Sequence, residues 1–259
     1  MLWDPKQYAQ FAGERSRPFF DLLAQVRNDQ VLQAADLGCG PGELTRALAE
    51  RWPGAQIVGV DNSPEMLAKA ARWALPNRLY FLQADIGTWK SDRPLDLIFS
   101  NAALQWVPEH DKVLDALVGM LAPGGTLAVQ VPNHFASPAH QLIKETAQQP
   151  RWKGLLDGAG LEAAAVKPLT WYVERLLGHG LTVDAWDTTY IHVLQGANPV
   201  LEWMKGTALR PLLSRLDSQQ SADFLRDLGA RYLAAYPASG QGSTLFPFRR
   251  IFFIATRPG

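Results

Sequence analysis

Three glycines at alternate positions follow an acidic residue early in the chain, in the order Asp36, Gly38, Gly40 and Gly42. Glycine suits such a loop because it adopts backbone angles that a Cβ forbids and lets a ligand lie against bare backbone. The helix expected to follow would offer free N–H groups to a carboxylate or a phosphate. A phosphate-binding loop has no use for the acid, whereas an ammonium group does. The pattern therefore favours a ligand with an amino-acid portion over a dinucleotide, whose loop reads Gly-x-Gly-x-x-Gly.

Further polar residues follow the later apolar runs of the same region. Asp61 can accept both hydroxyls of a ribose, although it can also cap the next helix, a role that Ser63 fills better. Asp85 can accept an adenine amino group with Ile86 against the ring, or it can be an ordinary turn aspartate. The fourth run ends in polar and aromatic side chains, namely Asn101, Gln105 and Trp106.

Apolar runs and helical patterns alternate between residues 31 and 132. Strands are expected at 31–37, 56–60, 79–83, 95–100 and 126–131. Helices are expected at 43–51, 63–72 and 109–121. Nearly all-apolar strands that alternate with helices predict a parallel sheet covered on both faces. Ligands bind outside the carboxyl ends of such strands, where all the residues named above fall.

The pattern changes after Pro132. We interpret 1–259 as a single domain with a cofactor-binding core at about 30–132. The segments of about 1–29, 133–182 and 195–243 are interpreted as insertions that form a substrate lid. Weak periodicity marks 133–182. Two β-rich runs, at 182–194 and 244–256, and helical patterns at 199–205 and 218–235 complete the chain.

Composition excludes several classes of protein. Lys+Arg and Asp+Glu both number 25, which disfavours a nucleic-acid binder because such proteins need basic excess. Cys39 is the only cysteine, so an internal disulfide cannot form. The start of the chain lacks a signal-peptide pattern, and no apolar stretch has the length of a membrane span. A cytoplasmic protein without a membrane partner is expected.

The predicted core resembles a known class of enzyme. The glycine loop, Asp61, Ala84-Asp85-Ile86 and Leu121-Ala122-Pro123-Gly124-Gly125 are similar to the ordered motifs of class I methyltransferases. The resemblance covers roughly residues 30–132. It implies a doubly wound, Rossmann-like α/β fold with a mostly parallel seven-stranded sheet whose last strand is antiparallel. It also implies S-adenosylmethionine as cofactor and S-adenosylhomocysteine as product.

Residues outside the core are similar to a narrower family, the methyltransferases that act on trans-aconitate. The similar stretches are Glu14–Pro18, Trp186–His192, Trp203, Gly206–Pro211, Tyr236-Pro237 and Arg250–Arg257. They span almost the full chain and imply a small polycarboxylate as acceptor. This chain departs from the family at one turn, where the family usually reads Gln-Met-Pro-Asp-Asn and this chain reads Gln130-Val131-Pro132-Asn133-His134. The departure leaves the particular acceptor open.

A planar tricarboxylate in a closed pocket needs positive partners, because unpaired charge is costly away from water. Arginine binds a carboxylate through two parallel hydrogen bonds. The candidates are Arg15, Arg17, Arg210 and Arg250, with Tyr190 and His192 as further donors. A surface arginine is more often solvated, but Arg210 and Arg250 stand in sparsely charged, apolar stretches.

A carboxylate acceptor needs no general base, since it is already ionised at neutral pH. Alignment and desolvation would then drive the transfer. Another acid remains an alternative, as does a carbon or nitrogen acceptor, for which His192 would be the first candidate base. Two other classes are a non-catalytic adenosylmethionine-binding protein and a nicotinamide-dependent dehydrogenase, which the glycine spacing disfavours. The histidines show no metal-ligand spacing, so no metal is expected.

Overall fold

The computed structural model describes residues 12–159 and 166–259, without the side chains of Ala12, Glu14 and Arg15. The first eleven residues of the predicted lid segment 1–29 lie outside this description. The chain divides into two compact units. Of the described residues, the sheet unit contains 15–132, 166–188 and 250–259, and the helical unit contains 12–14, 133–159 and 189–249.

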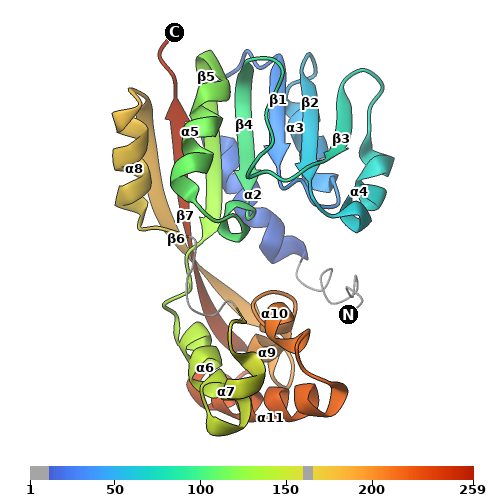
Figure 1. Ribbon diagram of the computed structural model, residues 1–259, viewed down its shortest axis with the longest axis vertical. Coiled ribbons are helices and arrows are strands. Elements are labelled where there is room, and N and C mark those ends of the chain that lie inside the picture. The colour runs from blue at the N-terminus through green and yellow to red at the C-terminus, as the bar shows by residue number, and fades with distance from the viewer. Residues whose placement is uncertain (1–11, 160–165) are drawn as a thin grey trace. The chain divides into compact units, whose positions relative to one another are not determined.

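One seven-stranded sheet runs in the order β3-β2-β1-β4-β5-β7-β6 (Figure 1). The strands are β1 Gln33–Leu37, β2 Gln56–Asp61, β3 Leu79–Gln83, β4 Leu95–Asn101, β5 Leu121–Pro132, β6 Thr182–Leu194 and β7 Thr244–Thr256. Strands β1 to β5 pair in parallel, and β7 pairs antiparallel to β5. This topology confirms the predicted mostly parallel sheet with an antiparallel last strand.

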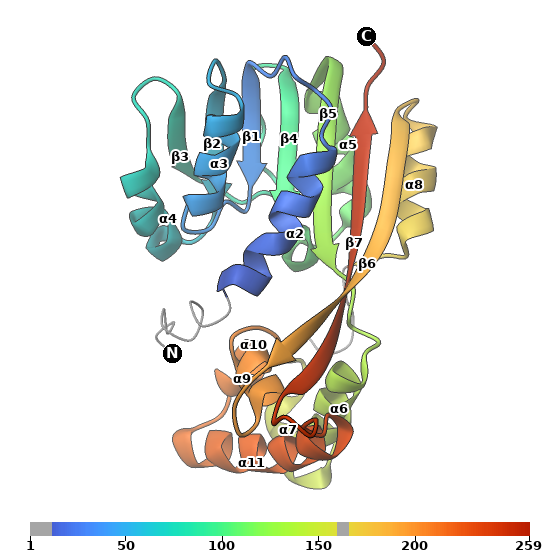
Figure 2. The ribbon, with the colours of Figure 1, turned by 180° about the vertical axis from the view of Figure 1, so that it is seen from behind.

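Helices cover both faces of the sheet unit. They are α2 Ala12–Gln25, α3 Glu43–Arg51, α4 Pro64–Ala70, α5 His110–Met120 and α8 Leu169–Gly178, with short 3-10 turns η1 Ala71–Trp73 and η2 Leu104–Trp106. Helices α5 and α8 lie over one face (Figure 1), and α2 and α3 over the other (Figure 2). Two-sided cover explains why Ile98, Phe99 and Val129 are fully buried, as the apolar runs predict.

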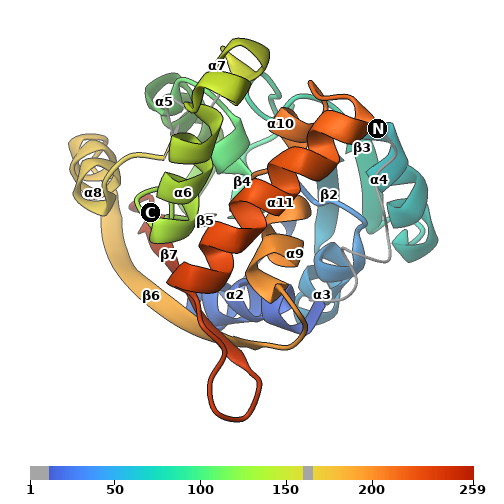
Figure 3. The same ribbon diagram turned by 90° about the horizontal axis from the view of Figure 1, so that it is seen from below.

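The helical unit has a core of its own. Its helices are α6 Pro138–Ala147, α7 Pro150–Leu156, α9 Pro199–Lys205, α10 Arg210–Leu213 and α11 Ser218–Ala235. Helix α11 packs on α6 and α9 (Figure 3) and buries Phe224 and Tyr232 beside Trp152 and Trp203. The Asp217 side chain accepts the Gln220 amide to form a capping box, which fixes where α11 begins.

The weakly periodic segment 133–182 contains more regular structure than its pattern indicated. It includes α6, α7 and α8, and α8 groups with the sheet unit, where Tyr172 and Leu176 join the core. Strands β6 and β7 each contribute residues to both units. No helix among the described residues is long and apolar enough to cross a bilayer.

Candidate functional site

The glycine loop connects β1 to α3 at the carboxyl edge of the sheet. Gly38, Gly40 and Gly42 have φ values of 78°, 53° and 79°, which lie in the left-handed region that favours glycine. The Gly38 and Cys39 amides donate to the Val60 carbonyl over 2.7 and 3.1 Å. The loop is therefore bound to the end of β2, and its backbone faces the edge where a ligand is expected.

The three glycines serve different purposes. A Cβ on Gly38 would lie 2.2 Å from the Ala103 Cβ, and a Cβ on Gly42 would lie 2.7 Å from Ala70 and Phe81. These two positions are filled by the protein itself. A Cβ on Gly40 would meet no described atom within 4 Å. In the direction of a Cβ, Gly40 alone of the three thus borders open space.

Asp36 lies at the end of β1 and is buried, with 3% of its surface exposed. Its Oδ2 accepts a 2.6 Å hydrogen bond from Thr45 Oγ1 of α3. Burial raises the pKa of Asp36 to about 7, the Thr45 bond lowers it, and the charge of Asp61 raises it further. A buried carboxylate with such a pKa gains from a cation beside it, which agrees with its predicted role toward an ammonium group.

Asp61, at the end of β2, supports the glycine loop directly. One carboxylate oxygen accepts the Gly40 amide and the other accepts the Ser63 amide, both over 2.9 Å. Ser63 itself caps α4, as predicted. Each carboxylate oxygen can accept a second hydrogen bond, so the Asp61 contacts leave capacity for the predicted ribose hydroxyls.

Asp85 and Ile86 follow β3 and occupy a tight turn. The exposed Asp85 carboxylate accepts the Gly87 amide over 2.8 Å. Ile86 is partly buried against the core of the sheet unit. The turn role of Asp85, an alternative from the sequence, is therefore present, and its predicted contact with adenine stays a prediction.

Unpaired acceptors gather at the end of β4 and in the turn that follows it. Among the described residues, Asn101 Oδ1 and Gln105 Oε1 are buried without a hydrogen-bond partner, while Gln105 Nε2 donates to the Ala102 carbonyl over 2.7 Å. Ala102 has φ 54°, a conformation that costs a residue with a Cβ about 1–2 kcal/mol. Trp106 is 65% exposed. Strain and unpaired acceptors together are typical of a ligand site.

A buried hydrogen-bond network, which no sequence pattern predicts, holds the segment after β4 in place. His110 Nε2 lies 2.8 Å from the Leu104 carbonyl, so this nitrogen carries the proton and donates. The Tyr172 hydroxyl, 2.6 Å away, therefore donates to Nδ1 and also accepts the Lys167 amide. Burial lowers the pKa of His110. The neutral ring thus connects α8 to η2, which carries Gln105 and Trp106.

The sheet unit contains three of the predicted acceptor-binding residues. Arg15 and Arg17 belong to α2; the Arg15 side chain is outside the described residues, and Arg17 is exposed beside Asp21 at 3.8 Å. Arg250, on β7, is 5% exposed, and its Nη1 donates to Gln130 Oε1 over 3.3 Å. Arg250 is thus a buried cation at the carboxyl edge. No pattern in the sequence predicts its contact with Gln130.

The other three candidates belong to the helical unit. Tyr190 and His192 are buried on β6 with stacked rings 6.3 Å apart, and His192 stacks on Trp203 at 4.6 Å. Arg210 begins α10 and is exposed.

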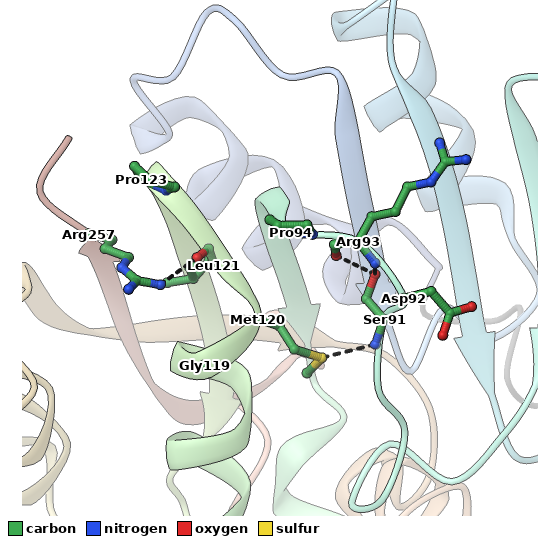
Figure 4. Close-up of a pocket in the computed structure, with 9 residues that line it drawn as sticks. All are labelled: Ser91, Asp92, Arg93, Pro94, Gly119, Met120, Leu121, Pro123 and Arg257. Atoms are coloured by element: carbon green, nitrogen blue, oxygen red, sulfur yellow. Dashed lines mark hydrogen bonds between the residues drawn. The ribbon is translucent and has the colours of Figure 1, made fainter.

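The described residues hold no group of three His, Cys, Asp or Glu side chains that could bind a metal. A cavity of about 330 Å³ lies near the amino ends of β4 and β5 (Figure 4). There Ser91 donates to Met120 Sδ, and Arg257 donates to the Leu121 carbonyl. This cavity lies at the edge of the sheet opposite the glycine loop.

The sheet order, the antiparallel last strand and the glycine loop define the class I methyltransferases. A family model described as a methyltransferase domain matches residues 34–125. In fold, the chain is similar to the YcgJ protein from Bacillus subtilis, with a TM-score of 0.61, 12% identity and coverage of 94% of this chain and 99% of that one. It is also similar in fold to phosphoethanolamine N-methyltransferase 2 of Haemonchus contortus, with a TM-score of 0.57 and 17% identity. This match covers 94% of this chain and 53% of that one.

Curated relatives match over nearly the whole chain. A trans-aconitate 2-methyltransferase of Streptomyces avermitilis is 51% identical, covering 98% of this chain and 96% of the relative. A second, from Streptomyces coelicolor, is 47% identical and covers 99% of this chain and 87% of the relative. A third, from Mycobacterium tuberculosis, is 43% identical and covers 98% of this chain and 96% of the relative. The chain therefore belongs to the trans-aconitate 2-methyltransferase family, which confirms the resemblance seen in its sequence.

Proposed function

We propose that this protein transfers a methyl group from S-adenosylmethionine to a carboxylate oxygen of trans-aconitate. The 51% identity to a trans-aconitate 2-methyltransferase over 98% of the chain carries the proposal. The site fits the cofactor on structural grounds, because Gly40 borders open space and Asp36, Asn101 and Gln105 offer acceptors to a cationic amino acid.

In this proposal the sheet unit binds the cofactor. The Asp36 carboxylate and Asn101 Oδ1 hold the methionine ammonium, and Asp61 accepts the ribose hydroxyls while it supports the Gly40 amide. Asp85 and Ile86 contact the adenine. The remaining cofactor contacts are made by the backbone of Gly38 and Gly42 and by the side chains of Gln105 and Trp106. When bound, S-adenosylmethionine supplies an electrophilic methyl group on a sulfonium leaving group.

The acceptor side requires positioning more than proton transfer. Arg15, Arg17, Tyr190, His192, Arg210 and Arg250 are proposed to bind the acceptor. A lone pair of one carboxylate oxygen forms the new O–CH₃ bond while the sulfur keeps the electron pair of the broken S–CH₃ bond. No proton moves, because the carboxylate is already ionised at neutral pH. The residues contribute by aligning the oxygen and by excluding water.

The segments 1–29, 133–182 and 195–243 are proposed as the substrate lid of a single enzyme domain, and the cytoplasm as its location. Another small acid or a carbon or nitrogen acceptor is the alternative, because the turn after Gln130 departs from the family pattern. The nature of the product decides between these acceptors.

The test is methyl transfer from labelled S-adenosylmethionine to a panel of di- and tricarboxylates. We expect a monomethyl ester of trans-aconitate, identified by mass spectrometry and by release of methanol in mild alkali. A product stable to alkali would exclude the ester and support a carbon or nitrogen acceptor. Binding of S-adenosylhomocysteine without transfer to any acceptor would indicate a non-catalytic binding protein.

A further inference from the structure

Polar side chains from four neighbouring strands lie in one row at the carboxyl edge. Sheet register pairs Asp36 with Phe99 and Asn101 with Gln130, and it pairs Gln130 with Phe252, two residues from Arg250. Paired residues, and alternate residues of one strand, point to the same face. Asp36, Asn101, Gln130 and Arg250 therefore project toward the face covered by α2.

The amide of Gln130 has a defined orientation within this row. Arg250 Nη1 can only donate, so the Gln130 atom 3.3 Å away must be the acceptor Oε1. The Gln130 side chain is fully buried, and its Nε2 has no hydrogen-bond partner among the described residues. A buried donor without a partner costs about 1–3 kcal/mol, which is typical of a group that awaits a ligand.

Hydrogen-bond acceptors occupy one end of this row, and hydrogen-bond donors occupy the other. Asp36 and Asn101 Oδ1 are acceptors, one of them a carboxylate, on β1 and β4. Gln130 Nε2 and the Arg250 guanidinium are donors, one of them a cation, on β5 and β7. This order complements a cationic ligand group beside an anionic one, which is the arrangement of charges that methyl transfer from a sulfonium to a carboxylate requires.

We propose that Gln130 is a specificity-determining residue whose Nε2, held in place by Arg250, donates a hydrogen bond to one carboxylate of the acceptor. This inference rests on the proposed function. Because Gln130 is fully buried, a carboxylate that reaches it has left water. Solvent then cannot replace the lost donor when the amide is removed.

The first measurement is the acceptor KM of Gln130→Leu and Gln130→Glu. Leucine has a similar size but no hydrogen-bond donor. We expect the acceptor KM to rise by about ten- to a hundredfold, which corresponds to the free energy of one hydrogen bond to a charged group. Glutamate forms an ion pair with Arg250, which preserves the fold, and repels the acceptor, so its KM rises further. Affinity for S-adenosylhomocysteine stays within about twofold in both, since the cofactor contacts are retained.

Thr126→Val is the matched control. Thr126 is buried on the same strand and the same face, four residues before Gln130, and lies beside Thr256 at 3.5 Å. This variant also removes a buried polar group from β5, but far from the carboxyl edge. It is expected to keep the wild-type KM, and thermal unfolding of all the variants shows how far each is destabilised.

A substrate series separates recognition from support of the fold. Mesaconate, itaconate and cis-glutaconate each lack a different one of the three carboxylates of trans-aconitate. If Gln130 binds one carboxylate, the loss caused by Gln130→Leu largely disappears for the acid that lacks that group and persists for the other two. An equal loss on trans-aconitate and all three of these acids, or a wild-type KM in both variants, overturns the proposal. Failure of the wild-type protein to methylate any acid would instead refute the proposed function.

Discussion

Thr45 Oγ1 donates a 2.6 Å hydrogen bond to Asp36 Oδ2, and both side chains are buried between β1 and α3. Burial raises the pKa of Asp36 to about 7 despite this bond, so the ligand-free protein carries a proton there at pH 6. A bound ammonium favours the ionised form. We therefore expect S-adenosylmethionine affinity to rise as the pH increases from 5 to 7, by up to about tenfold per pH unit, and then to level off.

Calorimetry at pH 6 in two buffers of different ionisation enthalpy measures the proton released on binding. The control is Asp36→Asn, which cannot titrate and should show neither proton release nor a pH-dependent affinity. The raised pKa of Asp36 also makes the free energy of unfolding depend on pH. Between about pH 4 and 7 the folded protein holds a proton that the unfolded chain has lost, so this residue stabilises the fold less as the pH rises. If the affinity of the wild-type protein for S-adenosylmethionine does not change with pH, Asp36 does not contact the cofactor ammonium.

Gly40→Ala is expected to weaken S-adenosylhomocysteine binding by at least about tenfold, because its Cβ would enter the open space beside the loop. Gly124→Ala is the matched control. Gly124 also has a left-handed φ, of 75°, and open space around it, but it lies at the other edge of the sheet. Both variants lose about 1–2 kcal/mol of stability to backbone strain, and only Gly40→Ala should lose cofactor affinity. Equal affinities would show that the loop does not border the cofactor.

Asp61→Ala is expected to reduce cofactor affinity by about 1–3 kcal/mol, since it removes both the predicted ribose acceptor and the partner of the Gly40 amide. Titration calorimetry with S-adenosylhomocysteine measures this loss. Asp217→Ala is the comparison, because Asp217 also accepts a backbone amide but caps α11 in the helical unit. It should cost stability of about 1 kcal/mol and leave the affinity unchanged. A folded Asp61→Ala protein with wild-type affinity would exclude Asp61 from the cofactor site.

Arg250→Ala is expected to raise the trans-aconitate KM by an amount equivalent to about 2–5 kcal/mol, the effect of removing one partner of a desolvated charge pair. Arg250→Lys should restore only part of this loss, because an ammonium lacks the planar fork of the guanidinium. Arg46→Ala removes a surface ion pair with Glu50 at 3.1 Å and should change the KM little. Steady-state kinetics at saturating cofactor compare the three variants. A wild-type KM in Arg250→Ala would remove this arginine from the acceptor site.

The helical unit is expected to lose stability in mild acid. His140 is buried next to His134, with ring centroids 4.5 Å apart, and burial lowers its pKa to about 4. Between pH 6.5 and 4 the unfolded chain binds a proton that the folded His140 does not, so stability falls as the pH falls, by up to about 3 kcal/mol. Urea unfolding at pH 7.5 and 4.5 measures the difference. His140→Phe should show a smaller difference, and an equal one would assign the acid sensitivity to other groups.

The parallel strands could be predicted because burial on both faces leaves them almost purely apolar. Helices α6 and α8 could not, since α6 buries the polar His140 and Thr146 beside Ile143, and α8 exposes the apolar Leu177. Polar residues on the buried side and apolar residues on the exposed side obscure the helical period. The spacing of the glycine loop and Asp61 is a local pattern, so these residues can be predicted as cofactor contacts from the sequence. The contact between Gln130 and Arg250 joins residues 120 positions apart, and no local pattern records it.

The left-handed φ of Ala102 has a consequence for the natural variation of this protein. A β-branched residue at this position would meet a larger steric penalty than alanine, whereas glycine would relieve the strain and asparagine would tolerate it. The backbone conformation therefore limits which residues position 102 can hold, independently of any contact with a ligand. A variant with glycine at position 102 would gain thermal stability and lose the rigidity of the segment that positions Asn101 and Gln105.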